Sequence, residues 1–182
     1  VDADGQVEIV TGGTFNDGTR DVAQLVVWTG SGLAVDRLTS WYWTGDTVIN
    51  SVALGDVDAD GQTEIVTAGY FNDGTRNVAQ LIAWTGSTLA VDRLTAWYWT
   101  GNTVINSVGL GDVDGDGKME IVTGGYFNDG TRNIAQMIAW NGLALSVEYI
   151  QCWFWFNSTP IYSVCLSDVN GDFSAEIATG GA

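Results

Sequence analysis

Short runs of apolar and β-branched residues alternate with turn sequences along the whole chain. In residues 57–112, four such runs follow one another, and they cover residues 64–71, 77–84, 89–99 and 104–113. The first two are separated by Asn-Asp-Gly-Thr, which favours a hairpin turn because Asn and Gly tolerate positive φ. Runs of this length between turn residues predict strands, and no segment has the period and caps of a helix. The pattern therefore predicts an all-β chain with four antiparallel strands per repeat.

The same pattern recurs every 56 residues, and residues 1–56 are identical to residues 57–112 at 46 of 56 positions. We divide the chain into a single array with repeats at residues 1–55, 56–111 and 112–167 and a partial repeat at 168–182. A period of this size with four strands is typical of β-propeller blades. In this register the chain supplies three strands, two complete blades and two further strands, or about three and a quarter blades. Because about four to eight blades close a ring, we expect the rest to come from more of the polypeptide, from neighbouring chains, or not at all in an open array.

The connection between the third and fourth strands has two interpretations. Gly45-Asp46 and Gly101-Asn102 are good centres for a two-residue hairpin, which would fold the third strand back onto the fourth. In the propeller interpretation the same residues lie in a crossing from the outer edge of one blade to the centre of the next, and we favour this crossing. It predicts that Cys152 and Cys165, which occur only in the third repeat, lie far apart and remain thiols.

Each repeat carries an acidic loop of the form D-x-D-x-D-G-x-x-E. The candidate ligands are Asp2, Asp4 and Glu8; Asp56, Asp58, Asp60 and Glu64; Asp112, Asp114, Asp116 and Glu120; and Asp168, Asn170, Asp172 and Glu176. Alternate carboxylates can face one centre, Gly at the sixth position permits a sharp turn, and the closing Glu completes a set of hard oxygen donors that suits Ca²⁺. Such turns without metal are the alternative, but repetition in register favours Ca²⁺. In the last loop Phe173 replaces the Gly and Asn170 lowers the charge, so we expect weaker binding there.

The loop and the strands around it resemble the FG-GAP or VCBS repeat of integrin-type propellers. Residues 107–125, Ser-Val-Gly-Leu-Gly-Asp-Val-Asp-Gly-Asp-Gly-Lys-Met-Glu-Ile-Val-Thr-Gly-Gly, carry the resemblance, and it recurs at every period. The end of the motif departs from the family, because Gly-Gly or Ala-Gly-Tyr replaces Gly-Ala-Pro. The resemblance implies a calcium-stabilised propeller, usually outside cells or on their surface and devoted to adhesion or ligand binding.

Composition narrows the functional classes. The formal net charge is −16, with 22 acidic residues against six Lys and Arg, which argues against nucleic-acid binding. The chain has no His, so catalysis through a His base within it is excluded, and near-identical repeats are poorly suited to one asymmetric active site. No apolar stretch is long enough to span a membrane. We therefore expect a protein that is not an enzyme.

Three tryptophans occur in each repeat, and two of them flank a Tyr or Phe near the end of the third strand. These pairs are Trp41 and Trp43, Trp97 and Trp99, and Trp153 and Trp155. We expect both members of a pair to share one strand face and fill the gap between blades, and the alternative is a repeated platform for stacking sugar rings. A polar set also recurs at fixed spacing, and it comprises Arg20, Arg76, Arg132, Gln24, Gln80 and Gln136. We expect these side chains to bond neighbouring backbone carbonyls, and the alternative is a polar rim that binds ligands. Asn157 lies in the one N-glycosylation sequon, with Pro160 just after it.

These observations lead to two functional hypotheses. The first is a non-catalytic, calcium-stabilised β-propeller module outside the cell or on its surface that binds proteins or glycans. The second is a structural subunit of an extracellular fibre or surface layer, in which neighbouring chains complete unfinished blades.

Overall fold

The computed structural model describes residues 1–182, and it contains thirteen strands and no helix. The strands are β1 (Glu8–Asn16), β2 (Asp21–Thr29), β3 (Val35–Trp41), β4 (Thr47–Gly55), β5 (Glu64–Asn72), β6 (Asn77–Thr85), β7 (Val91–Trp97), β8 (Thr103–Gly111), β9 (Glu120–Asn128), β10 (Asn133–Asn141), β11 (Val147–Trp153), β12 (Ile161–Ser167) and β13 (Glu176–Gly181). With no helix present, no helical membrane span exists in the structure.

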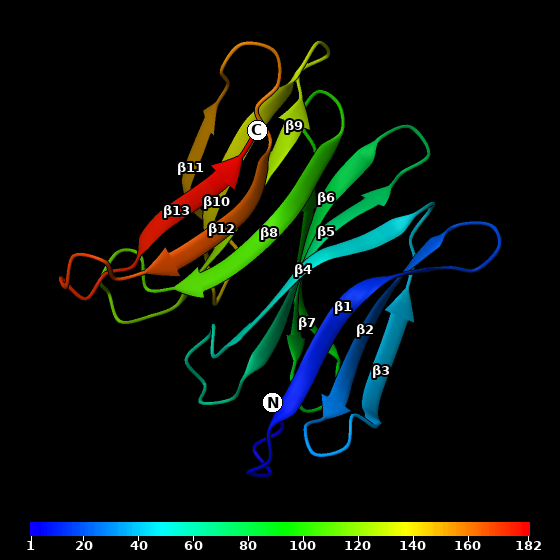
Figure 1. Ribbon diagram of the computed structural model, residues 1–182, viewed down its shortest axis with the longest axis vertical. Helices are drawn as coiled ribbons and strands as arrows, with labels where there is room; N and C mark the ends of the chain where they lie inside the picture. Colours follow the sequence, from blue (N-terminus) through cyan, green and yellow to red (C-terminus); the bar gives the residue numbers. More distant parts are fainter.

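The strands form four antiparallel sheets that follow one another along the chain (Figure 1). The first sheet has the order β1-β2-β3, the second β4-β5-β6-β7, the third β8-β9-β10-β11, and the fourth β12-β13. This division into three, four, four and two strands confirms the all-β, blade-like prediction. The sheets do not close into a ring, so the architecture is an open, propeller-like array.

The crossing between sheets is also confirmed. β3 and β4 belong to different sheets, as do β7 and β8, so the Gly-Asp and Gly-Asn sequences do not make hairpins. Instead, Asp46 accepts a hydrogen bond through Oδ1 from the backbone N–H of Asp21 at 2.8 Å, and Asn102 accepts the equivalent bond from Asn77. Cys152 on β11 and Cys165 on β12 lie in different sheets and are free thiols.

The first strands of the second, third and fourth sheets are joined side to side by hydrogen bonds at an irregularity in their pairing. In β4 the register shifts between Ile49 and Ser51, which leaves Asn50 without a ladder partner. The Asn50 side chain donates to the Ile105 carbonyl of β8 at 2.8 Å, and the Val108 N–H donates to Ser51 Oγ at 3.1 Å. The same pair of bonds links β8 to β12, so the contact between the second and third sheets is repeated between the third and fourth.

The hydrophobic core lies between consecutive sheets and not within any single one. Ala23, Leu25 and Val27 of the first sheet cluster with Ile65 and Trp84 of the second. A larger cluster joins the second and third sheets in the same way, and a small one joins the third sheet to β12. Each sheet therefore depends on its neighbours to bury its apolar side chains.

Candidate metal centres

One acidic loop precedes β1, and the other three connect β4 to β5, β8 to β9 and β12 to β13. We call residues 1–7, 56–63, 112–119 and 168–175 loops 1 to 4, with the closing Glu at the start of the strand that follows. In loops 1 to 3, carboxylate oxygens from three residues lie within 4.8 Å of one another. These groups are Asp2, Asp4 and Glu8; Asp56, Asp58 and Glu64; and Asp112, Asp114 and Glu120. Three convergent carboxylates form a donor set that fits a hard divalent cation such as Ca²⁺.

The closing glutamates are deeply buried for charged residues. Glu64 is 4% exposed and Glu120 is 2% exposed. One oxygen of each is held by a backbone donor: Val57 N–H donates to Glu64 Oε2 at 3.0 Å, and Val113 N–H donates to Glu120 Oε2 at 2.8 Å. Burying a carboxylate costs free energy unless it is paired, and a bound cation would offset that cost.

In loops 2 to 4, the first Asp accepts hydrogen bonds from the backbone of its own turn. In loop 2, Asp56 accepts backbone N–H bonds from Asp60 and Gly61, the latter at 2.9 Å. Gly61 has φ +87°, which confirms that the sixth loop position needs the left-handed conformation. The structure also shows Ala59 at φ +61°, a strained fourth position where loops 3 and 4 have Gly, and the sequence analysis missed this.

In loops 2 and 3, the predicted ligands Asp60 and Asp116 lie outside the three-carboxylate groups. Asp60 accepts hydrogen bonds from the backbone and side chain of Gln62 at 2.7 and 2.9 Å. Asp116 accepts a hydrogen bond from the backbone N–H of Lys118 and forms an ion pair with Lys118 Nζ. These contacts lower the pKa of Asp116. Both side chains would have to turn inward to contact a cation.

Loop 4 differs from the other three. The Asn170 amide donates to Glu176 Oε1 at 2.6 Å and to Asp172 Oδ2 at 3.1 Å, so an N–H group points where the other loops have a carboxylate. Phe173 takes the sixth position at φ +74° and is almost fully exposed. Asp168 accepts the backbone N–H groups of Gly171 and Phe173, which lowers its pKa. This arrangement offers fewer free oxygen donors than loops 2 and 3.

Comparison with known families supports the resemblance noted from the loops. The family model described as FG-GAP repeat matches residues 105–135. Residues 105–135 match the FG-GAP repeat. A comparison with curated proteins finds no match. The matched segment begins in β8 and runs through loop 3 and β9 into β10, so the FG-GAP segment includes the Asp112, Asp114 and Glu120 group.

The buried Glu64 and Glu120 make the stability of the metal-free chain depend on pH. Burial, reinforced by the neighbouring Asp carboxylates, raises the pKa of Glu64 and of Glu120 above the ordinary value of 4.5. Between 4.5 and the raised value the folded chain therefore binds more protons than the unfolded chain. We expect the metal-free free energy of unfolding to fall as pH rises through this interval. Urea unfolding from pH 4 to 8 in chelator-treated buffer measures this slope.

The control for this pH prediction is Glu120→Gln, which removes one of the two titrating groups and keeps its shape. The variant should show a shallower fall in stability with rising pH than the natural chain. An identical slope in both proteins would contradict the prediction, because the dependence would then have another source.

The paired tryptophans occupy two different environments. The rings of Trp41 and Trp84 are 4.7 Å apart across the first and second sheets, and those of Trp97 and Trp140 are 4.8 Å apart across the next pair. Trp43, Trp99 and Trp155 lie beyond the ends of the third strands and are half-exposed or more. The expectation that both members share one strand face is wrong, because each strand ends at the first Trp. Trp153, at the end of β11, is partly buried beside the Ile161 and Val164 cluster.

The arginines and glutamines considered for a polar rim also lie in two different environments. Arg20, Arg76 and Arg132 lie over the rings of Tyr42, Tyr98 and Phe154 at 4.3–4.6 Å. Gln80 and Gln136 are buried, and each accepts the indole N–H of a tryptophan. Gln80 and Gln136 are therefore unavailable for a rim, whereas the arginines remain in place for one. Asn157 is exposed in the crossing from β11 to β12.

Two arginines near the metal centres were not identified from the sequence. Arg37 on β3 forms an ion pair with Asp2 at 3.2 Å, and Arg93 on β7 forms one with Asp58 at 3.3 Å. Their recurrence at the 56-residue period was visible in the sequence, but their contact with the loops depends on the folded sheet.

Proposed function

We propose that this chain is a calcium-stabilised, propeller-like module that binds proteins or glycans outside the cell or on its surface. The FG-GAP match suggests a propeller-like binding or adhesion module. The observation that carries the proposal is the convergence of three carboxylates in each of three successive loops, with buried Glu64 and Glu120 at the base of two of them.

In this proposal calcium stabilises the sheets and takes no direct part in ligand binding. A cation held by Asp112, Asp114 and Glu120 would tie loop 3 to the start of β9 and offset the repulsion among these carboxylates. The half-exposed aromatic side chains at the crossings, such as Trp43 and Trp99, recur at the period of the sheets. Repeated side chains on a rigid array suit multivalent binding, in which several weak contacts add up.

A glycan array and a panel of cell-surface proteins, probed with and without calcium, test the proposal. We expect binding in millimolar calcium that a chelator abolishes and added calcium restores. Trp99→Ala should weaken glycan binding while leaving the calcium stoichiometry unchanged. Absence of any calcium binding in a titration would refute the proposal, because both the stabilisation and the ligand binding are proposed to depend on calcium.

A second candidate is a structural subunit of a fibre or surface layer. The outer strands β3, β7 and β11 each have one unpaired edge, and they expose apolar residues such as Leu38, Leu94 and Ile150. Unpaired, apolar edges favour strand addition between molecules. Ordered polymers in electron micrographs, formed in calcium without any ligand, would favour this candidate over the first.

A further inference from the structure

Arg93 lies between a metal centre and the neighbouring sheet. Its Nη2 is 3.3 Å from Asp58 Oδ2 in loop 2, and its Nη1 donates to the carbonyl oxygen of Gly142 in the turn between β10 and β11. Arg37 repeats the arrangement one sheet earlier, with Asp2 of loop 1 and the Gly86 carbonyl of the β6–β7 turn, the latter at 2.7 Å. One side chain thus contacts a candidate cation ligand and the backbone of the next sheet.

The setting makes this contact selective for arginine. The Arg93 side chain is 14% exposed, and it forms a second ion pair with Asp92 at 2.7 Å. A guanidinium can donate in two directions at once from a fixed planar fork, whereas a lysine amine is a single point charge. The partly buried charge is thus held by two carboxylates and one carbonyl.

The turn that Arg93 contacts also packs directly against the metal loops. A Cβ atom at Gly142 would lie 2.0 Å from the carbonyl oxygen of Val57 in loop 2 and 2.6 Å from that of Met119 in loop 3. The backbone of the turn therefore packs against both loops and leaves no room for a side chain at residue 142. The turn thus lies beside loops 2 and 3, and the contacts of Arg93 link it specifically to loop 2.

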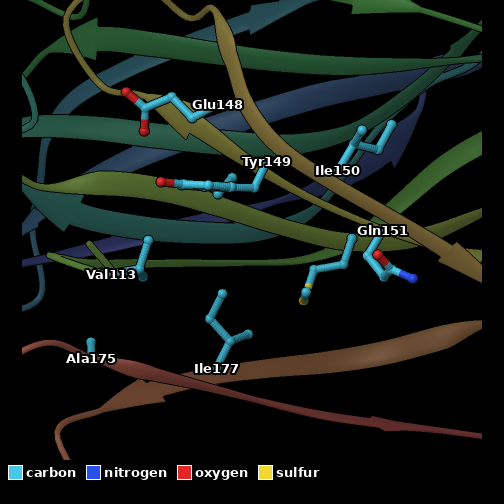
Figure 2. A pocket seen from close by; sticks show the side chains of 9 residues that line it. Val113, Glu148, Tyr149, Ile150, Gln151, Ala175 and Ile177 are labelled. Carbon is cyan, nitrogen blue, oxygen red and sulfur yellow. The ribbon is translucent and has the colours of Figure 1, made fainter.

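The third repeat lacks this arginine, because Tyr149 stands where the earlier repeats have Arg37 and Arg93. Tyr149 lines a pocket of about 690 Å³ between the third and fourth sheets, together with Val113 and Ile177 (Figure 2). Asp114 of loop 3 accordingly has no ion pair, in contrast to Asp2 and Asp58. The chain therefore contains two kinds of metal centre, with and without an arginine link.

We propose that Arg93 couples cation binding at loop 2 to the β10–β11 turn of the next sheet, that Arg37 couples loop 1 to the β6–β7 turn, and that loop 3 lacks such a link. This inference rests on the proposed calcium binding. A cation that fixes Asp58 also fixes its ion pair with Arg93, which in turn holds the Gly142 carbonyl. Arg93 is a positioning residue, since it contacts a ligand side chain instead of the cation.

Hydrogen exchange followed by mass spectrometry tests the coupling in the natural chain and in Arg93→Tyr, which introduces the residue that the third repeat already has. The Leu145 N–H bonds to the Asn141 carbonyl in the coupled turn, and the Leu89 N–H bonds to the Thr85 carbonyl in the Arg37-linked turn. In the natural chain we expect calcium to slow exchange about 5–10-fold in both turns, a coupling of ordinary size. In Arg93→Tyr the slowing should become smaller at residues 141–146 and persist in full at residues 85–90 and in loop 2.

The outcomes separate the two proposals. If calcium slows exchange nowhere, calcium binding itself fails and the coupling fails with it. If calcium protects loop 2 in Arg93→Tyr and the 141–146 turn stays equally protected, the coupling alone is overturned. Should Arg93→Tyr not fold, Arg93→Lys keeps the charge but cannot hold Asp58 and the Gly142 carbonyl together. It should show less calcium-dependent protection of residues 141–146 than the natural chain and the same protection of loop 2. Full protection of that turn in Arg93→Lys would likewise overturn the coupling.

Discussion

Replacing Trp140 with alanine will lower the free energy of unfolding by about 3–5 kcal/mol, the range for removing a buried large aromatic side chain. Trp140 is 4% exposed in the cluster between the second and third sheets. Its ring is 4.8 Å from that of Trp97, and its indole N–H donates to Thr123 Oγ1 at 3.0 Å. The change therefore leaves a cavity and removes the donor to Thr123 Oγ1, whose hydroxyl keeps its own bond to the Ile138 carbonyl. Urea unfolding in calcium, followed by circular dichroism, measures the loss.

Trp155→Ala is the matched control for Trp140→Ala, because it removes the same atoms from a site that is 71% exposed. It should change the free energy of unfolding by less than about 0.5 kcal/mol, as expected for an exposed position. Equal losses in the two variants would mean that the sheets are not held together by the tryptophan contacts between them.

Removing calcium will lower the free energy of unfolding by an amount similar to that lost in Trp140→Ala. A ligand that binds only the folded state stabilises it by about 2.7 kcal/mol per site when its free concentration is 100 times its Kd. Two occupied loops would therefore contribute about 5 kcal/mol under that condition. Thermal unfolding in millimolar calcium, in excess EGTA, and in EGTA followed by calcium in excess measures the effect.

Glu120→Gln gives this chelation experiment a control at one loop. The variant loses one carboxylate of the Asp112, Asp114 and Glu120 group and should show a smaller calcium-dependent shift in melting temperature than the natural chain. An unchanged melting temperature of the natural chain in EGTA would contradict a stabilising role for the ion.

The local sequence pattern predicted the strands and the order of the sheets, because each strand is bounded by turn residues and recurs in near-identical copies. Gly101-Asn102 was the ambiguous point, since the same residues suit a hairpin. The structure uses Asn102 to accept the Asn77 N–H, a contact between segments 25 residues apart. Period-two alternation failed at Trp99 because β7 ends at Trp97, where the chain leaves the sheet.

The contacts of Arg93 could not be predicted for a related reason. Asp58 and Arg93 are 35 residues apart, and they meet because loop 2 and β7 come together in the folded second sheet. Spacing alone cannot show that the guanidinium also reaches Gly142 in the next sheet. The acidic loops were easier to predict from the sequence, because the candidate ligands of each loop lie within nine consecutive residues and their geometry is local.

The near identity of consecutive sheets creates a hazard during folding. β4 and β8 differ only at Ala53 and Gly109, and each pairs with its own partner in the same register, starting with Thr47 opposite Phe71 or Thr103 opposite Phe127. β8 can therefore pair with β5 almost as well as β4 does. Within one chain this pairing would leave β4 unpaired in a misfolded state, and between two chains it would produce a strand-exchanged dimer. Divergence protects against such errors, and Tyr162 of β12, which replaces Asn50 and Asn106, makes that strand a poorer substitute.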